Sequence, residues 1–241
     1  LMRSQDAGTA VADSNAASEA ARSAGVPTPR VVDVIEIDGR PAQILERIDG
    51  HDLFAYLAAN PFRLPEVAST LAAVHVQLHQ VAAPAELVST NERLSRPLQE
   101  SHLVPAAARR QALHALDRLP AGDAICHGDY HPGNVLLGDA GPVLIDWTGA
   151  TRGDPTADFA RTRLMLRVGE LPPGSPAAVR ALAAVGRRAL WKLYDRDYRR
   201  ARVVDLDLAD RWTFVVAANR LTEGIESERP ALLRTLRELA G

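Results

Sequence analysis

The sequence predicts an α+β fold, in which a small N-terminal portion with a β-hairpin precedes a larger and mostly helical portion. Residues 9–24 are rich in alanine and are followed by two apolar runs on either side of Asp38-Gly39, a strong hairpin turn signal. Beyond them, apolar residues recur at helical spacing over most of the chain. A second pair of short apolar runs, at 135–137 and 142–145, interrupts the helical region and predicts another hairpin.

The N-terminal portion should consist of one helix and one hairpin. The helix over 9–24 contains neither Gly nor Pro, and Gly25 and Pro27 end it. The runs 31–37 and 42–48 alternate or remain apolar and have the length of strands. We therefore expect a helix that packs on a two-stranded antiparallel unit.

The rest of the chain, apart from the second hairpin, should be helical. Gly and Pro residues separate the segments with helical spacing of apolar residues, and no internal repeat or coiled-coil heptad is present. The expected helices span 51–59, 64–81, 90–99, 105–118, 155–168, 175–200, 206–224 and 228–240.

Composition excludes several classes of protein. With 241 residues and 46% hydrophobic content, the chain can bury a sizeable core. A formal charge of -2 gives no reason to expect nucleic acid or an anionic membrane as a partner. No run approaches the roughly 20 apolar residues of a membrane span. The start of the chain has no apolar core of a signal peptide, and one cysteine excludes an internal disulfide. We expect a cytoplasmic protein, whose oligomeric state the sequence leaves open.

The stretch between the helix expected over 105–118 and the second hairpin is the richest in residues that can bind metals or catalyse reactions. His127, Asp129, His131 and Asn134 share a short loop with two glycines and a proline, the composition of a tight functional turn. An antiparallel hairpin brings its two outer ends together, so Asn134 and Asp146 should lie side by side. Two oxygen ligands are then expected to converge beside Asp129.

This arrangement is what phosphoryl transfer requires. The reaction needs a carboxylate that takes the hydroxyl proton and hard oxygen ligands that hold Mg²⁺ against the phosphates. In protein kinases an Asp is followed five positions later by a metal-binding Asn, and then by a second Asp beyond a hairpin. Asp129, Asn134 and Asp146 repeat that spacing. They predict Asp129 as the catalytic base, and Asn134 and Asp146 as the metal ligands.

Two motifs carry a resemblance to a known group of enzymes. Residues 127–134 read His-Gly-Asp-x-His-x-x-Asn, and an Ile-Asp-Trp at 145–147 is followed by Gly-Asp-Pro at 153–155 and by Asp158. With these residues, the chain closely resembles the aminoglycoside phosphotransferase and choline kinase-like superfamily. The resemblance implies transfer of the γ-phosphate of ATP or GTP to a hydroxyl of a small molecule, with Mg²⁺ as cofactor.

The resemblance also implies a fold and a domain organisation. The fold would be a protein kinase-like two-lobe fold. Residues 1–48 would form a partial N-terminal lobe and the inter-lobe linker, and residues 49–241 the helical C-terminal lobe with the catalytic loop. In such a fold the backbone of Glu46, Arg47 and Ile48 would pair with the base of the nucleotide. Leu137 and Ile145 would line the nucleotide site.

Four further residues are implied to brace the site. His127 and His131 would hold the loop through hydrogen bonds. Asp154 precedes Pro155, a favoured first residue of a helix, and Asp158 lies in the first turn, where carboxylates suit the helix N-terminus. Asp154 and Asp158 therefore look like a capping pair that supports the loop structurally.

The acceptor cannot be deduced from the sequence. Relatives usually contact their substrates through the helices that follow Asp158, and acidic residues there can hold cationic amines. Glu223, Glu226 and Glu228 are candidates on this basis. An aminoglycoside, a choline-like amine, a sugar, an amino acid or a macrolide would all suit the motifs.

The first part of a kinase-like N-terminal lobe is missing. Such enzymes cover the nucleotide with a glycine-rich loop and hold its phosphates with a strand lysine paired to a helix glutamate. Here Gly8 is isolated and Lys192 is the only lysine. Glu19 is the only glutamate of the first helix, but it lies closer to the end of that helix than the lysine-pairing glutamate of relatives does. Asp13 or Asn15 would fit the position of that glutamate better. A fragment of a longer kinase, or a diverged chain that cannot clamp the phosphates, would have this sequence.

Two alternatives to a kinase follow. The first is a non-catalytic kinase-like binding protein or an inactive fragment. The second is a zinc hydrolase that uses His127, Asp129 and His131 as ligands, a cluster with an open position. The other histidines lie in helical or loop stretches without a second ligand pair, and His79 is expected to be a core residue bonded to a backbone carbonyl. These other histidines are His51, His75, His79, His102 and His114.

Overall fold

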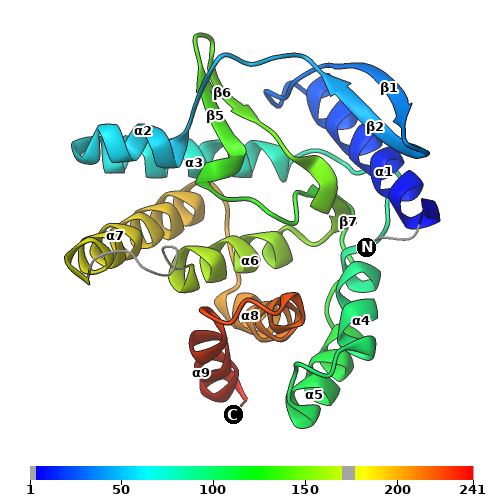
Figure 1. Cartoon of the computed structure of the whole chain (residues 1–241). Coiled ribbons are helices and arrows are strands. Elements are labelled where there is room, and N and C mark those ends of the chain that lie inside the picture. Colours follow the sequence, from blue (N-terminus) through cyan, green and yellow to red (C-terminus); the bar gives the residue numbers. More distant parts are fainter. Residues whose placement is uncertain (1–3, 170–176, 241) are drawn as a thin grey trace.

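The computed structural model describes residues 4–169 and 177–240. In this part of the chain, one long helix and a β-hairpin lie at one end, and a second hairpin stands above most of the remaining helices (Figure 1). The helices are α1 (Ser4–Ser23), α2 (Leu53–Ala59), α3 (Leu64–Leu78), α4 (Thr90–Glu100), α5 (Ala106–Leu116), α6 (Pro155–Val168), α7 (Ala177–Ala201), α8 (Leu206–Arg220) and α9 (Arg229–Leu239). The strands are β1 (Val31–Ile37), β2 (Arg40–Leu45), β3 (Gly50–Asp52), β4 (Ala124–Cys126), β5 (Val135–Gly138), β6 (Gly141–Leu144) and β7 (Thr151–Gly153). Four single 3₁₀ turns, η1 (Pro61–Arg63), η2 (Pro132–Asn134), η3 (Trp147–Gly149) and η4 (Leu221–Glu223), complete the described elements.

The predicted helices are present, with corrections at their ends. The helix predicted from residue 51 begins only at Leu53, because the two residues before it form strand β3, and the Asp52 side chain caps it by accepting the Ala55 N–H at 2.9 Å. The helix predicted to continue to residue 224 ends at Arg220 and is followed by η4. Residues 175 and 176, the predicted start of α7, lie outside the described residues.

The N-terminal hairpin turns where the sequence predicted. Asp38 and Gly39 both have positive φ, 52° and 72°, which a tight hairpin turn requires and which glycine adopts without strain. The second strand was expected over 42–48 but covers Arg40–Leu45. It ends early because the chain leaves the hairpin after Glu46, whose N–H still bonds the Arg30 carbonyl at 2.8 Å, and crosses to form β3.

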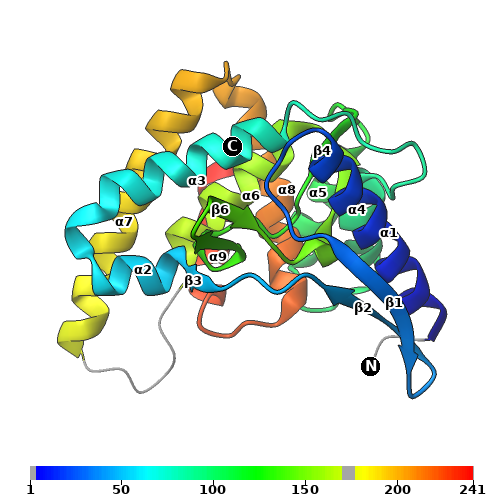
Figure 2. The same ribbon diagram turned by 90° about the horizontal axis from the view of Figure 1, so that it is seen from above.

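Helix α1 covers one face of this hairpin (Figures 1 and 2). Its alanines allow close approach, and Ala17 and Ala21 are fully buried. The segment between α1 and β1 joins this unit to the rest of the molecule. Pro27 accepts a hydrogen bond from the Leu144 N–H at 2.8 Å, and the Thr28 hydroxyl donates to the Leu144 carbonyl at 3.0 Å.

The second hairpin lies at the centre of the molecule. Strands β3, β5 and β6 form a three-stranded antiparallel sheet in that order, with Val135 opposite Leu144. Strand β3 approaches β5 closely at Gly50, where a Cβ would lie 2.4 Å from the Leu137 carbonyl oxygen. A larger residue at position 50 would push the two strands apart, so glycine is required there.

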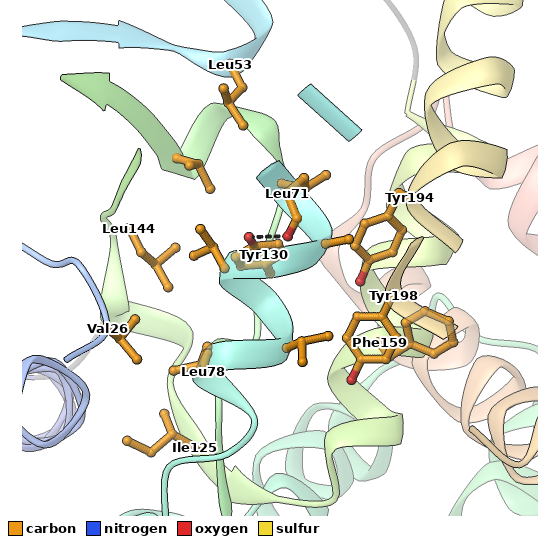
Figure 3. Close-up of a cluster of buried hydrophobic side chains, with 14 of the residues drawn as sticks. Val26, Leu53, Leu71, Leu78, Ile125, Tyr130, Leu144, Phe159, Tyr194 and Tyr198 are labelled. Carbon is orange, nitrogen blue, oxygen red and sulfur yellow. Dashed lines mark hydrogen bonds between the residues drawn. The ribbon is translucent and has the colours of Figure 1, made fainter. Parts of the chain in front are cut away.

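The described residues form two hydrophobic cores, one of which includes this sheet. One joins α1, α3, α7 and the central hairpin. Figure 3 shows part of it, with Leu78 and Leu144 on one side of α3 and the α7 tyrosines on the other. The other joins α4, α5, α6, α8 and α9, with Trp212 fully buried at its centre. Over 4–169 and 177–240, no helix combines the length and apolar character needed to cross a bilayer.

Candidate functional site

The loop between β4 and β5 is built on a buried histidine. The His127 ring accepts the Asp129 N–H on Nδ1 at 3.3 Å, so its Nε2 carries the proton that is donated to the Ile145 carbonyl at 3.0 Å. Burial lowers the pKa of His127, which keeps the ring neutral. The ring thus links the loop to the residue that precedes Asp146.

Asp158 on α6 binds the backbone of the same loop. One carboxylate oxygen accepts the His127 N–H at 2.6 Å, and the other accepts the Gly128 N–H at 2.9 Å. Gly128 has φ 77°, and a Cβ there would lie 2.1 Å from the Gly149 carbonyl oxygen. Asp158 was expected to cap its own helix. Instead, its carboxylate binds the loop backbone, while Asp154 is the N-cap of α6 and accepts the Thr156 N–H at 2.8 Å.

Asp129 keeps an accessible carboxylate in this loop. Its side chain is 37% exposed, and its two nearest charged or ring groups are His131 Nε2 at 3.6 Å and Arg161 Nη2 at 3.7 Å. Burial alone would raise the pKa of Asp129. The His131 ring and the Arg161 charge outweigh that effect, so the pKa lies below the usual value and the carboxylate is ionised near neutral pH.

The central hairpin brings Asn134 and Asp146 to neighbouring positions. The Ile145 N–H donates to the Asn134 carbonyl at 2.9 Å, so the residue before Asp146 is bonded to Asn134 itself. The Asn134 amide group donates to the Asp129 carbonyl at 2.9 Å, which leaves its Oδ1 as an acceptor. Asp146 is exposed and has φ 60°, and one carboxylate oxygen accepts the Thr148 hydroxyl at 2.6 Å.

The ring nitrogens of the loop do not form a zinc cluster. His127 uses both of its nitrogens on backbone groups, and His131 Nδ1 accepts the Gly133 N–H at 3.0 Å. In the described part of the chain, the one group of His, Cys, Asp or Glu residues spaced for a metal is His75, His79 and Asp158. The loop geometry therefore does not support the zinc hydrolase alternative.

The histidines of α3 were expected to have no second ligand pair, and this expectation is wrong. His75 and His79 each direct Nε2 at the same Asp158 oxygen, at 3.1 and 3.2 Å. His79 was expected to bond a backbone carbonyl, but its partners are Asp158 and the Tyr198 hydroxyl. The i, i+4 spacing of the two histidines was a signal that they share one helix face, although nothing local indicated which residue they would meet.

The residues implied to bind the nucleotide lie between β2 and β3 and on or just after the central hairpin. Glu46 and Arg47 are exposed, Ile48 is half-buried, and Leu137 and Ile145 are half-buried on the hairpin and just after it. A cavity of about 170 Å³ opens between α1, β2 and the start of η3, and of these five residues it is lined by Ile145. Its lining residues are Ser14, Ser18, Pro29, Gln43, Leu45, Ile145, Asp146, Trp147 and Thr148.

None of the helix residues considered as a phosphate-clamp acid lines this cavity. Glu19 is exposed and pairs with Arg22 at 2.6 Å. Asn15 accepts a hydrogen bond from the Gln43 amide, and burial raises the pKa of Asp13, with the Arg93 charge acting in the opposite direction. The α1 side chains that face Asp146 across the cavity belong to Ser14 and Ser18, which sequence reasoning did not single out.

The acidic candidates after α8 differ from one another. Glu228 is buried and receives two hydrogen bonds from Arg220, at 2.7 and 2.9 Å. Glu226 is exposed. Glu223 contacts Arg161 at 3.0 Å, and Arg161 in turn lies beside Asp129, so of the three candidates Glu223 is the one linked to the loop. Sequence reasoning missed Arg161.

Solved structures with a similar fold include aminoglycoside phosphotransferases and an amicoumacin kinase. One is a thermostable mutant of aminoglycoside phosphotransferase APH(4)-Ia in complex with AMP-PNP and hygromycin B, with a TM-score of 0.62 and 17% identity over 94% of this chain and 81% of that chain. Another is the amicoumacin kinase hAmiN in complex with AMP-PNP, Ca²⁺ and Ami, with a TM-score of 0.62 and 13% identity over 96% of this chain and 77% of that chain. A third is APH(3'')-Id from Streptomyces rimosus in complex with ADP and streptomycin, with a TM-score of 0.57 and 16% identity over 90% and 85%. At these identities the similarity shows the fold, which is kinase-like with a mostly helical C-terminal part.

No curated protein sequence matches the chain. A family model does match, over residues 3–204, and it describes the phosphotransferase enzyme family APH. The match covers most of the chain and includes the whole loop and central hairpin. The chain therefore belongs to the phosphotransferase enzyme family.

Proposed function

We propose that this protein transfers the γ-phosphoryl group of ATP or GTP to a hydroxyl of a small molecule, with Asp129 as the base. The observation that carries the proposal is the accessible, ionised Asp129 carboxylate on a loop whose backbone is fixed by buried hydrogen bonds. A base of this kind must reach its substrate while the loop around it stays in place. Asp129 would accept the acceptor's hydroxyl proton as the oxygen attacks the γ-phosphorus.

The oxygen donors beside Asp129 suit a hard divalent cation. The NH₂ group of Asn134 donates a hydrogen bond within the loop, which leaves its amide oxygen available as a ligand. Asp146 offers an exposed carboxylate. These are ligands that Mg²⁺ prefers. When bound there, Mg²⁺ would neutralise charge on the β- and γ-phosphates.

We assign the nucleotide to the side of the central hairpin that carries the cavity. The N–H of Glu46 is already bonded to Arg30, so the backbone groups of Arg47 and Ile48 are the ones offered to a base edge. Leu137 and Ile145 would provide the apolar surface under the base. Because backbone contacts carry this recognition, ATP and GTP are both compatible with it. In this scheme the linker would end near residue 48, where the N-terminal lobe meets the C-terminal lobe.

The bracing residues would keep the base in register with the metal ligands. His127 ties the loop to Ile145, and Asp158 holds two consecutive loop N–H groups. Asp154 caps α6 and also accepts the Trp212 indole N–H at 3.3 Å. His131 would orient the carboxylate of Asp129 from its side.

For the acceptor, we propose a site around Glu223. This carboxylate is linked through Arg161 to Asp129, so a group bound there would lie near the base. Glu226 is exposed and Glu228 is buried. Arg220 pairs with both Glu228 and Glu223, so what distinguishes Glu223 is its link to the loop through Arg161 and not an unpaired charge. Solved relatives are complexes with hygromycin B, streptomycin and amicoumacin, so antibiotics of these kinds, which would imply a resistance enzyme, are the first acceptors to test.

One observation favours a second function, a non-catalytic nucleotide-binding protein. Lys192 is the only lysine of the chain and lies in α7, and the α1 side chains that face Asp146 are serines. No lysine–glutamate pair can then clamp the α- and β-phosphates from α1 and the strands that follow it. Weak nucleotide affinity without turnover would fit this alternative.

The experiment that tests the proposal compares Asp129→Asn with Asp146→Ala. We expect Asp129→Asn to reduce turnover by about 10²–10⁴-fold while leaving Mg²⁺–nucleotide binding nearly intact, because the base acts on the acceptor. Asp146→Ala should weaken nucleotide binding in the presence of Mg²⁺ as well. Transfer of radiolabelled phosphate measures turnover, and calorimetry measures nucleotide binding. Equal loss of binding in both variants would contradict the separate roles, and binding without any wild-type turnover over the antibiotic panel would favour the non-catalytic alternative.

A further inference from the structure

Two buried tyrosines of α7 stand at the start of a hydrogen-bonded network that ends at the candidate catalytic loop. The Tyr194 hydroxyl lies 2.7 Å from His75 Nδ1, and the Tyr198 hydroxyl lies 2.6 Å from His79 Nδ1. Figure 3 shows the two tyrosines one turn apart on α7, beside α3 and Phe159. Each bond spans 119 positions of sequence, so it is a tertiary contact and not part of a helix or turn.

Both histidines direct their other nitrogen at Asp158. His75 Nε2 and His79 Nε2 lie 3.1 and 3.2 Å from the same carboxylate oxygen, and the side chains of all three residues are fully buried. The carboxylate has two further partners, the N–H groups of His127 and Gly128. Asp158 thus receives four donors and has no solvent contact, which satisfies a buried carboxylate without a cation.

The chemistry of the network assigns its donors. Burial by itself would raise the pKa of Asp158, but the hydrogen bonds from His75 and His79 outweigh it, and the pKa lies well below the usual value. An ionised carboxylate only accepts hydrogen bonds, so His75 Nε2 must carry a proton. Burial lowers the pKa of His75 to about 3, so the ring is neutral and its Nδ1 is the acceptor of the Tyr194 hydroxyl.

The tyrosine hydroxyl therefore selects the tautomer of the histidine. Without a donor at Nδ1, the His75 ring could move its proton there, and the Nε2 lone pair would then face the Asp158 carboxylate. The Asp158 carboxylate would then lose the hydrogen bond from His75 and be repelled by the lone pair on Nε2. This would weaken its hold on the His127 and Gly128 N–H groups, whose hydrogen bonds it also accepts. The third buried tyrosine of this core, Tyr130, does not take part through its hydroxyl, because that hydroxyl donates to the Leu71 carbonyl at 2.7 Å (Figure 3).

We infer that Tyr194 and Tyr198 are positioning residues for the loop that carries Asp129, acting through His75 and His79 on Asp158. Their effect on the reaction rests on the proposed function, whereas their effect on the loop does not. The network couples α7, α3 and α6 to two consecutive loop amides. Any change that shifts α7 relative to α3 would then be transmitted to the residues next to Asp129.

The test uses the full chain and the variants Tyr194→Phe, Tyr198→Phe and Thr213→Val. The Thr213 side chain is also buried, and its hydroxyl donates only to the Ala209 carbonyl within α8, so the valine variant loses a buried hydroxyl bond outside the network. Hydrogen exchange is followed at His127 and Gly128 and compared, in each protein, with exchange at Leu144. The quantity compared is the exchange rate of the His127 and Gly128 amides divided by that of the Leu144 amide. We expect each phenylalanine variant to raise this ratio about tenfold, which corresponds to the loss of one hydrogen bond, and the valine variant to leave it unchanged.

A second readout is the ring ¹⁵N spectrum of His75. The wild type should show a neutral ring protonated at Nε2, and Tyr194→Phe should reduce that population. In active enzyme, both phenylalanine variants should lower kcat about tenfold with the nucleotide KM unchanged. An unchanged exchange ratio in both variants would overturn the inference, as would one equivalent of tightly bound zinc that is lost in His75→Gln. Absence of wild-type turnover would count against the proposed function alone, because exchange and tautomer are measured without it.

Discussion

The two β-hairpins of this protein have the same local design and very different surroundings. Each consists of two short antiparallel strands of apolar residues joined by a tight turn. In the β1–β2 hairpin no residue is buried, and Val32, Val34 and Ile37 are 50, 45 and 54% exposed. In the β5–β6 hairpin, Val135 and Leu144 are fully buried.

The difference comes from what each hairpin pairs and packs with. The β5–β6 hairpin gains a third strand in β3 and hydrogen bonds from the 27–28 segment, and helices surround it. In the described residues, the β1–β2 hairpin has α1 on one face and no third strand. An isolated two-stranded hairpin is marginal in water, so rigidity in this molecule belongs to the hairpin whose ends carry Asn134 and Asp146. The site is built where the backbone is held most firmly.

The largest expected effect on this comparison comes from truncating one apolar side chain in each hairpin. Leu144→Ala should lower the free energy of unfolding by about 2–5 kcal/mol, because the side chain is fully buried and leaves a cavity. Ile44→Ala, at a side chain that is 41% exposed in β2, should cost less than about 1 kcal/mol. Urea denaturation measures both values, and similar losses would show that the two hairpins are equally integrated.

Hydrogen exchange would sharpen the comparison at the level of single amides. We expect the amides of β1 and β2 to exchange faster than those of β5 and β6, because their sheet contains no buried residue and has no third strand in the described part of the chain. Leu144 and Ile145, which donate to Pro27 and Asn134, should be among the slowest. Protection in β1 and β2 as strong as in β5 and β6 would contradict a difference in stability between the two hairpins.

A smaller effect is expected at the joint between the two hairpins. The Thr28 hydroxyl accepts the Trp147 indole N–H at 2.7 Å and donates to the Leu144 carbonyl. Thr28→Val keeps the shape and removes both bonds, so it should cost about 1–3 kcal/mol, with the loss concentrated in protection of α1 and β1–β2. Thr222→Val, which removes a bond made only to Asn219 nearby, is the matched control and should leave that protection unchanged.

Local signals in the sequence were sufficient for the elements of the site. The Asp-Gly turn, the alternation of short apolar runs and the Asp154-Pro155 helix start depend on neighbours within a few residues, and the structure has each of them. The spacing of Asp129, Asn134 and Asp146 predicted that a hairpin would join the last two, and β5–β6 does so. Strand ends were less accurate, because β3 is defined by its partner β5 and not by its own three residues.

The sequence by itself determined the family, the order of the helices and of the two hairpins, and the loop that carries Asp129. Tertiary structure alone decided which distant side chains meet: His75 and Asp158 are 83 positions apart, His75 and Tyr194 are 119 apart, and Arg161 reaches Glu223 across 62. It also decided that Ser14 and Ser18, and not an acidic residue of α1, face Asp146. The physical reason is that turn and helix preferences act over a few residues, whereas a buried polar group takes its partner from whichever helix packs beside it.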